Sequence, residues 1–296
     1  MFYKAFGLLF RSEFPLDAAP ILTEQTPDVA IHSRPLGNLE GDWNQAGICF
    51  RARPADCVLE LPDVASFRIL NGNEIRVVLH KPEALEDMLV ILQTSALGAL
   101  LYQRGRLALQ ASVIQKEGRA TLLCGRSGAG KSALAAWLSQ RGFSPVSDEI
   151  AAINDADLEL GVWPGPPHWK LWTDMVAKLG FDFEQATTVR SSVLHKHLVR
   201  NDQRISDPVR IDKIVILDWW NKSDSHWEKV EAPGNFQALL RNTYRGVYAE
   251  GLGPNRDYFR SAAALARQAQ VFVAIRPDGG PERLEEFGQF LLEHLQ

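Results

Sequence analysis

The stretch Leu122-Leu123-Cys124-Gly125-Arg126-Ser127-Gly128-Ala129-Gly130-Lys131-Ser132 joins an apolar strand-like segment to a helical one. Its last eight residues match the pattern G-x-x-x-x-G-K-[ST]. Glycine permits backbone conformations in which successive N–H groups turn inward around phosphate oxygens. Lys131 adds a positive charge, Ser132 offers a hydroxyl to Mg²⁺, and the helix that follows directs the positive end of its dipole at the anion. The sequence therefore predicts a phosphate-binding loop (P-loop). Its nucleotide-binding residues would be Gly125, Arg126, Ser127, Gly128, Ala129, Gly130, Lys131 and Ser132.

The composition is that of a packed, soluble protein. Of 296 residues, 46% are hydrophobic and 23% are charged, so the chain has the apolar content that a folded core needs. The net charge of −4 provides no basic excess for nucleic-acid or lipid phosphates, so neither nucleic acid nor a membrane is an expected partner. A homo-oligomer stays open. Three cysteines without metal-ligand spacing are typical of reduced thiols, which favours a cytoplasmic location.

Residues 1–81 are predicted to form a small, mainly antiparallel β-rich N-terminal module without chemistry of its own. Asn71-Gly72-Asn73 is its clearest hairpin turn. Its aromatic residues Trp43, Phe50 and Phe67 are interpreted as core. The predicted strands are Tyr3–Phe10, Asp28–His32, Gly47–Arg53, Cys57–Leu61, Ser66–Leu70 and Glu74–Leu79.

Residues 82–106 are predicted to form a helix that bridges two modules. Pro82 and Glu83 open it, and leucine, methionine and alanine recur near helical spacing up to about Gln103. The uncharged run Met88 to Tyr102 is interpreted as a buried helix because it is short for a membrane span. Residues 107–296 would then form the second module, which contains the P-loop.

An acidic pair follows the P-loop. Strands are predicted at Leu107–Ile114 and Arg119–Cys124, then the helix Lys131–Gln140, and then Asp148-Glu149 at a strand. Phosphoryl transfer needs a carboxylate to hold Mg²⁺, and a kinase needs another to orient or deprotonate the acceptor hydroxyl. The order of these elements favours a catalytic pair over a solvated surface pair.

Two further segments carry alternatives that the residues leave open. Val162 to Trp172 is rich in proline and tryptophan and is predicted to form a long loop, either for packing or as an acceptor-binding wall that presents Lys170 or His168. Arg190 to Arg210 is the most basic part of the chain. It is either a solvated face or a contact for the triphosphate or an acidic substrate.

The C-terminal half alternates between strand-like and helical patterns. We expect strands at Ile211–Trp219 and Val271–Ile275, and helices at Asn235–Tyr244, Asp257–Gln268 and Pro281–Leu295. This alternation predicts an α/β domain whose helices surround a mostly parallel or mixed sheet.

Taken together, these motifs resemble the HPr kinase-related family from about Leu107 to the C-terminus. In that family a strand is followed by G-x-S-G-x-G-K-S, a helix, Arg-Gly-His or a similar triplet, and then Asp-Asp or Asp-Glu. Here these features are Gly125–Ser132, Arg141-Gly142-Phe143 and Asp148-Glu149. The resemblance implies a fold like that of HPr kinase and of ATP-dependent phosphoenolpyruvate carboxykinase. It also implies an enzyme that uses ATP and Mg²⁺ to phosphorylate serine.

The same resemblance implies roles for individual residues. Lys131 would contact the β- and γ-phosphates, Ser132 would contact the metal, and Asp148 and Glu149 would divide metal binding and hydroxyl activation. Two features depart from the family. The Glu-Ile-Arg-Gly-Leu-Gly signature of the bifunctional HPr kinase/phosphorylases is absent, so HPr is not the expected substrate. Gln110 stands where many relatives have histidine, and a glutamine side chain cannot exchange a proton near neutral pH.

The segment around Trp163 and Pro167 instead resembles the branch of kinases that modify lasso peptide precursors at a C-terminal serine. The leading hypothesis is therefore an ATP-dependent serine kinase that acts on a precursor peptide or small protein. A terminal serine brings a carboxylate that a cation would bind. The candidate cations are Lys170, His195, Lys196, Arg200 and Arg204. The alternatives are a carboxykinase-like phosphotransferase for a small metabolite, and a regulatory protein that senses ATP without transferring phosphate.

Overall fold

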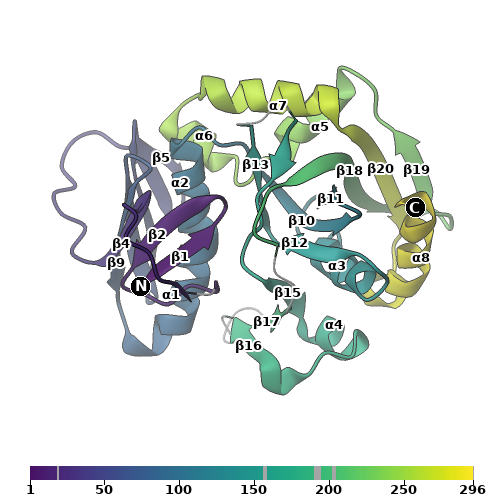
Figure 1. The fold of residues 1–296 in the computed structure, drawn as a ribbon, viewed down its shortest axis with the longest axis horizontal. Helices are drawn as coiled ribbons and strands as arrows, with labels where there is room; N and C mark the ends of the chain where they lie inside the picture. The colour runs from purple at the N-terminus through teal and green to yellow at the C-terminus, as the bar shows by residue number, and fades with distance from the viewer. Residues whose placement is uncertain (19, 156–158, 190–194, 202–204, 296) are drawn as a thin grey trace. The chain divides into compact units, whose positions relative to one another are not determined.

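The chain folds into a mixed α/β structure with two compact units (Figure 1). The computed structural model describes residues 1–18, 20–155, 159–189, 195–201 and 205–295. Unit 1 contains Met1–Ala108 and Tyr244–Arg260, and unit 2 contains Leu109–Thr243 and Ser261–Gln296. The linear division at residues 81 and 106 therefore differs from the structure in two ways. The helical segment belongs to unit 1, and a distant piece of the C-terminal half completes that unit.

Unit 1 is built on one nine-stranded sheet. Most neighbouring strands are antiparallel, but β4 pairs in parallel with both β2 and β9. The order is β3 (Pro20–Ile21), β1 (Phe2–Ala5), β2 (Leu8–Ser12), β4 (Val29–Ser33), β9 (Glu74–Leu79), β8 (Ala65–Leu70), β7 (Asp56–Leu61), β6 (Phe50–Arg53) and β5 (Asn44–Gly47).

Two strands predicted from the sequence are hairpins instead. The stretch Tyr3–Phe10 turns at Phe6 and Gly7, which have φ angles of 51° and 68°. Each of these residues adopts the left-handed conformation that tight turns use. The stretch Gly47–Arg53 is divided in the same way, because β5 ends at Gly47 and β6 begins at Phe50.

One apolar helical segment packs within unit 1. It consists of η1 (Pro82–Ala84), α1 (Leu85–Ile91), a π-helical turn η2 (Leu92–Ala96) and α2 (Leu97–Gln103). By length and composition the whole segment Pro82–Gln103 could cross a membrane, yet 78% of its most apolar window is buried inside the protein. This burial agrees with the prediction of a buried core helix. Gly98 allows the close approach of α6 (Val247–Leu252) and the residues before it, because a Cβ at Gly98 would lie 2.4 Å from the Tyr244 ring.

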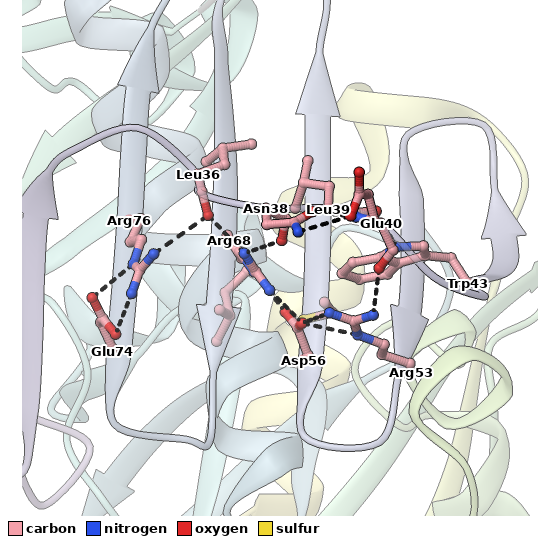
Figure 2. A network of polar contacts seen from close by, with 12 residues as sticks. Leu36, Asn38, Leu39, Glu40, Trp43, Arg53, Asp56, Arg68, Glu74 and Arg76 are labelled. Carbon is pink, nitrogen blue, oxygen red and sulfur yellow. Dashed lines mark hydrogen bonds and ion pairs between the residues drawn. The ribbon is translucent and has the colours of Figure 1, made fainter.

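Arginine side chains of the unit 1 sheet bind the backbone of the segment formed by residues 34–43 (Figure 2). Arg68 donates hydrogen bonds to the carbonyl oxygens of Leu36 and Asn38, both at 2.8 Å, and Arg53 donates to that of Glu40 at 3.0 Å. Asp56 lies between the two guanidinium groups and accepts hydrogen bonds from both. Trp43 is half-buried against Arg53 and does not belong to the core, unlike the buried Phe50 and Phe67.

Unit 2 contains an eight-stranded mixed sheet. Its strands are β10 (Ala108–Lys116), β11 (Arg119–Cys124), β12 (Ser144–Ser147), β13 (Ile150–Asn154), β14 (Gly161–Val162), β18 (Val209–Trp220), β19 (His226–Lys229) and β20 (Gln270–Pro277). Strand β18 pairs in parallel with both β11 and β20, whereas β10 and β11 form an antiparallel hairpin. Residues Leu123, Val215 and Leu217 therefore share one buried face of this sheet.

Helices α3 (Lys131–Ser139) and α8 (Leu284–Leu295) pack against that face and against each other (Figure 1). Trp137 of α3 is buried, and its indole N–H donates to Glu285 of α8 at 2.7 Å. Helix α5 (Gly234–Arg241) contacts α7 (Arg256–Gln268) through a hydrogen bond from Asn235 to the carbonyl oxygen of Ala266. The core that α3 shares with α8 and the sheet supports the first turn of α3, where the glycine-rich loop ends.

The proline- and tryptophan-rich segment is a loop only in its first part. From His168 to Trp172 it forms strand β15, which pairs with β17 (Lys196–Arg200), and β17 pairs with β16 (Ala186–Val189). Helix α4 (Thr173–Lys178) and the 3₁₀ turn η3 (Phe183–Gln185) lie between β15 and β16 along the chain. The loop prediction is wrong for residues 168–172, because Trp169 and Leu171 alternate with polar residues and bury one face of β15 in the core below α3.

Candidate functional site

The glycine-rich loop leaves β11 and ends at the first turn of α3. Gly125, Gly128 and Gly130 have φ angles of 135°, 85° and 94°, in the region that favours glycine. Gly125 is constrained further by β18, since a Cβ there would lie 2.5 Å from the carbonyl oxygen of Leu217. The sequence pattern thus has a physical cause at this position. The loop passes so close to the sheet that it has no room for a side chain.

Lys131 lies at the start of α3 with its ammonium group turned back to the loop. Nζ donates hydrogen bonds to the carbonyl oxygens of Gly125 at 2.9 Å and Arg126 at 3.0 Å. Burial lowers the pKa of Lys131 below its usual range, although the charge of Asp148 acts in the opposite direction. Lys131 and the loop residues from Ser127 onward line a pocket of about 640 Å³. All the residues that line this pocket belong to unit 2.

Asp148 lies in the same pocket and is held by three elements. Its Oδ1 accepts hydrogen bonds from Ser112 Oγ at 2.5 Å and from Ser132 Oγ at 2.9 Å, and its Oδ2 accepts one from the backbone N–H of Lys170 at 2.8 Å. The side chain is nearly inaccessible, with 7% of the residue exposed. The carboxylate is therefore fixed in direct contact with the hydroxyl that ends the loop motif.

Glu149 occupies the turn between β12 and β13 rather than a strand. It has a φ of 70°, and the N–H of Ile150 donates to the carbonyl oxygen of Asp148 at 2.9 Å across it. Such a conformation costs a non-glycine residue about 1–3 kcal/mol. The Glu149 carboxylate forms an ion pair of 2.9 Å with Lys170 Nζ, and both side chains are mostly buried. The strained turn directs two consecutive carboxylates to different partners.

The small sheet contributes two cations to the pocket, Lys170 and Lys196. Lys170 and Trp172 lie on the face of β15 opposite to the buried Trp169. Lys196, the first residue of β17, is paired with Trp172 of β15. Lys196 Nζ lies 4.6 Å from the centroid of the Trp172 ring. Burial, followed by the charge of Lys170, lowers the pKa of Lys196. Two of the five predicted substrate cations, Lys170 and Lys196, thus meet at one end of the pocket.

The other predicted substrate residues have different positions. His195 lines the pocket, and its carbonyl oxygen accepts hydrogen bonds from the N–H and the hydroxyl of Thr173. Arg200 is exposed at the far end of β17, opposite His168, and is not among the residues that line the pocket. Arg204 and Arg190 lie outside the described residues.

Several residues that the sequence analysis did not select also belong to the site. Ser112 contacts Asp148, and Gln110, Arg276, Arg283 and Trp172 line the pocket. One signal was present in the sequence, because Ser112 lies two residues beyond Gln110 and therefore on the same face of the strand that precedes the loop. Arg276 and Arg283 follow β18 by more than a helix and a strand, and only the fold brings them to the loop.

Ser132 and Asp148 are suitable ligands for Mg²⁺. This ion prefers oxygen ligands and is commonly held by one or two carboxylates, with substrate phosphates and water completing its shell. Within the described residues, no group of three or more histidine, cysteine, aspartate or glutamate side chains could hold a metal ion. A magnesium ion at Ser132 and Asp148 would accordingly take its remaining ligands from phosphate and water.

Comparisons with known proteins add little to this geometry. No protein-family model matches the chain, and no curated protein matches it. One solved structure, described as that of the Hpr(Ser) kinase/phosphatase from Coxiella burnetii, is similar over 63% of this chain and 89% of its own length. The sequence identity is 12% and the TM-score is 0.30. A likeness at this TM-score establishes neither fold nor activity, so the function is argued from the residues of the pocket.

Proposed function

We propose that the protein is an ATP-dependent kinase that transfers the γ-phosphoryl group of ATP to a serine hydroxyl. The observation that supports this proposal best is the contact of 2.9 Å between Ser132 Oγ, the last residue of the loop motif, and Asp148 Oδ1. It joins a phosphate-binding sequence to an acidic pair in one pocket. A protein that only senses ATP has no need for a second carboxylate, Glu149, beside that contact.

Each residue of the pocket has a proposed role. The N–H groups of the loop and Lys131 bind the phosphates of ATP, and Lys131 exchanges its contacts with the Gly125 and Arg126 carbonyl oxygens for phosphate oxygens. Ser132 and Asp148 hold Mg²⁺, which would neutralise charge on the phosphates when bound. Glu149 accepts the proton of the acceptor hydroxyl, because Asp148 already accepts three hydrogen bonds.

The transfer is a direct displacement. The acceptor oxygen forms a bond to the γ-phosphorus, and the bond from that phosphorus to the bridging oxygen breaks with its electron pair remaining on ADP. The hydroxyl proton passes to Glu149. Lys170 holds the Glu149 carboxylate in place through its ion pair of 2.9 Å.

The finer proposal concerns family and acceptor. The order of motifs from Leu107 onward supports membership of the HPr kinase-related family, and the segment around Trp163 supports its lasso peptide branch. We propose a precursor peptide as the acceptor, with phosphate added to its C-terminal serine. The pocket itself also favours a second candidate. A pocket of about 640 Å³ into which lysines converge has the size typical of small-molecule sites, so a hydroxy-acid metabolite is the alternative acceptor.

The test is incubation of the protein with ATP, Mg²⁺ and two panels of acceptors, followed by intact-mass measurement. One panel holds peptides that end in serine, and the other holds small hydroxy acids. We expect a gain of one phosphate on a peptide, and no gain with Lys131→Ala. Lys222→Ala is the control, because Lys222 is exposed and is not among the residues that line the pocket. A fully active Lys131→Ala variant would refute the assignment of the loop.

A further inference from the structure

Among the residues that the structure describes, five lysine and arginine side chains line the pocket, and four of them have a polar partner. Lys170 pairs with Glu149 at 2.9 Å, and Arg283 pairs with Glu286 at 2.5 Å. Lys131 donates to two loop carbonyl oxygens, and Arg276 donates to the carbonyl oxygen of Pro277 at 3.0 Å. Lys196 differs from all of these. Within the described part of the chain, its ammonium group has no carboxylate or carbonyl partner and contacts the Trp172 ring.

The surroundings of Lys196 make this arrangement costly without an anion. Its side chain is half-buried, and the transfer of an ammonium group from water into protein is unfavourable unless an opposite charge compensates it. Lys170, on the neighbouring strand β15, repels it, whereas Glu149 and Asp148 attract it. These two carboxylates already bind other partners, Glu149 the ammonium group of Lys170 and Asp148 three hydrogen-bond donors. The ring of Trp172 offsets a part of the cost, by about 0.5–2 kcal/mol. An anionic group from a ligand would supply the remainder.

The position of Lys196 selects the acceptor rather than ATP as the source of that anion. Lys196 is paired with Trp172 of β15, and Lys170, whose ammonium group binds Glu149, lies two residues before Trp172 on the same face of β15. Lys196 therefore lies beside the pair on the proposed proton-accepting side of the pocket. The phosphates already have Lys131 and the loop N–H groups. Lys170 is a weaker candidate for the acceptor anion than Lys196, because its charge is compensated by Glu149.

We propose that Lys196, supported by the Trp172 ring, binds a carboxylate that the acceptor carries next to its reacting hydroxyl, and so determines which acceptors are used. This inference rests on the proposed kinase function and deepens it. The carboxylate has two possible sources in a peptide, the C-terminal α-carboxylate of a terminal serine or the side chain of an adjacent aspartate or glutamate. A small hydroxy acid would present the same chemistry.

Matched peptides distinguish these sources. A short peptide ending in serine is compared as free acid and as amide, and an amide with aspartate before the serine is compared with its asparagine counterpart. Affinity is measured by calorimetry in the presence of Mg²⁺ and a non-hydrolysable ATP analogue, and kcat/KM is measured with ATP. We expect the free acid to exceed the amide by about 10- to 100-fold, the range for a hydrogen bond between charged groups. A preference seen only in the aspartate pair would assign the carboxylate to the side chain.

Variants of Lys196 connect the preference to this residue. Lys196→Met should remove the difference between acid and amide without changing the KM for ATP, and Lys196→Arg should restore a part of it. Lys229→Met, an exposed lysine of β19, should leave the preference intact. Because Lys196→Met removes a half-buried charge, its melting temperature should not fall.

The inference is overturned if Lys196→Met keeps the preference for the acid, or if it raises the KM for ATP equally with both acceptors. It is also overturned if neither peptide pair differs in affinity. The binding measurement separates this inference from the proposed function. A preference for the acid in binding, without any transfer, would support the role of Lys196 while refuting the kinase activity.

Discussion

Asp148 and Glu149 are adjacent in sequence but have different surroundings. Asp148 is buried among two hydroxyl groups and one backbone N–H, whereas Glu149 faces the ammonium group of Lys170. In Asp148→Asn, the amide NH₂ would face the N–H of Lys170 or the two serine hydroxyls. We expect this variant to lose Mg²⁺-dependent ATP binding and about 1–3 kcal/mol of unfolding free energy.

In Glu149→Gln we expect ATP binding to persist and kcat to fall by about 10²- to 10⁴-fold.

ATP affinity measures the effect on binding, the urea midpoint measures the effect on stability, and single-turnover transfer measures the effect on kcat. Native transfer by Glu149→Gln would exclude it as the proton acceptor.

The proposed role of Lys196 predicts a pH dependence of the reaction. Burial and the charge of Lys170 lower its pKa below the ordinary 10.5, while Glu149 and Asp148 act in the opposite direction. The protonated form binds the acceptor carboxylate. Affinity is therefore complete below the lowered pKa and is lost as the pH rises through it. We expect kcat/KM for the acid peptide to decline at a lower pH than it would if the binding lysine had its ordinary pKa. With the amide, or in Lys196→Met, that decline should be absent, and its persistence would assign it to another group.

At this scale the sequence predicts residue types better than their roles. The motif from Gly125 to Ser132 and the acidic pair are recognisable because their spacing is local. The proposed division of roles between Asp148 and Glu149 is argued from their contacts with Ser112 and Lys170, which come from other strands. The basic run predicts that a cation is available near the site. The register of β15 with β17 places Lys196 beside Trp172 at the pocket and Arg200 beside His168 at the other end of the strand.

At the scale of elements, the position of α3 depends on a glycine in α8. A Cβ on Gly288 would lie 2.8 Å from two atoms of the Trp137 ring, so the two helices touch at this point without an intervening side chain. In an exposed helix, glycine to alanine is worth about 1 kcal/mol of stabilisation. Here we expect the clash to prevail, because overpacking of a core costs about 1–3 kcal/mol. Gly288→Ala should lower the urea midpoint, whereas Gln289→Ala, on the exposed side of α8, should not.

An unchanged midpoint in Gly288→Ala would mean that α8 can move away from Trp137 at no cost. A lower midpoint combined with weaker ATP binding would connect this contact to the loop, which α3 supports from below.

The sequence predicts elements correctly where one face is apolar over many residues, and incorrectly where short strands alternate with short loops. Strand β11 and helices α3 and α7 lie within one residue of their predicted bounds. By contrast, the sequence predicts a loop where β15 lies, because Pro164, Pro166 and Pro167 precede it. Its strand character depends on pairing with β17, in which Leu198, the partner of Lys170, lies 28 residues further along the chain. Local propensity contains no information on such a partner.

At the scale of the whole molecule, unit 1 is discontinuous in sequence. The segment Tyr244–Arg260 completes it, and Tyr248 donates a buried hydrogen bond of 2.7 Å to the carbonyl oxygen of Ser95. A linear division of the sequence cannot include such a segment, because no composition change marks residues 244–260 as part of the N-terminal unit. The residues of the pocket, in contrast, all belong to unit 2.

This division predicts that ATP binding and the stability of unit 1 respond to different substitutions. Tyr248→Phe leaves the Ser95 carbonyl oxygen without its buried donor, so we expect it to lose about 1–3 kcal/mol of unfolding free energy. Ser112→Ala, in unit 2, removes a donor from Asp148, and the loss of such a supporting contact weakens metal affinity by about 10- to 100-fold. A ligand at 100 times its Kd stabilises the folded state by about 2.7 kcal/mol. Thermal unfolding with and without Mg·ATP should therefore show a lowered melting temperature but an intact ATP-induced shift in Tyr248→Phe, and a reduced shift in Ser112→Ala. If Tyr248→Phe reduced the ATP-induced shift as much as Ser112→Ala does, nucleotide binding would depend on unit 1 as well, and the assignment of the site to unit 2 alone would fail.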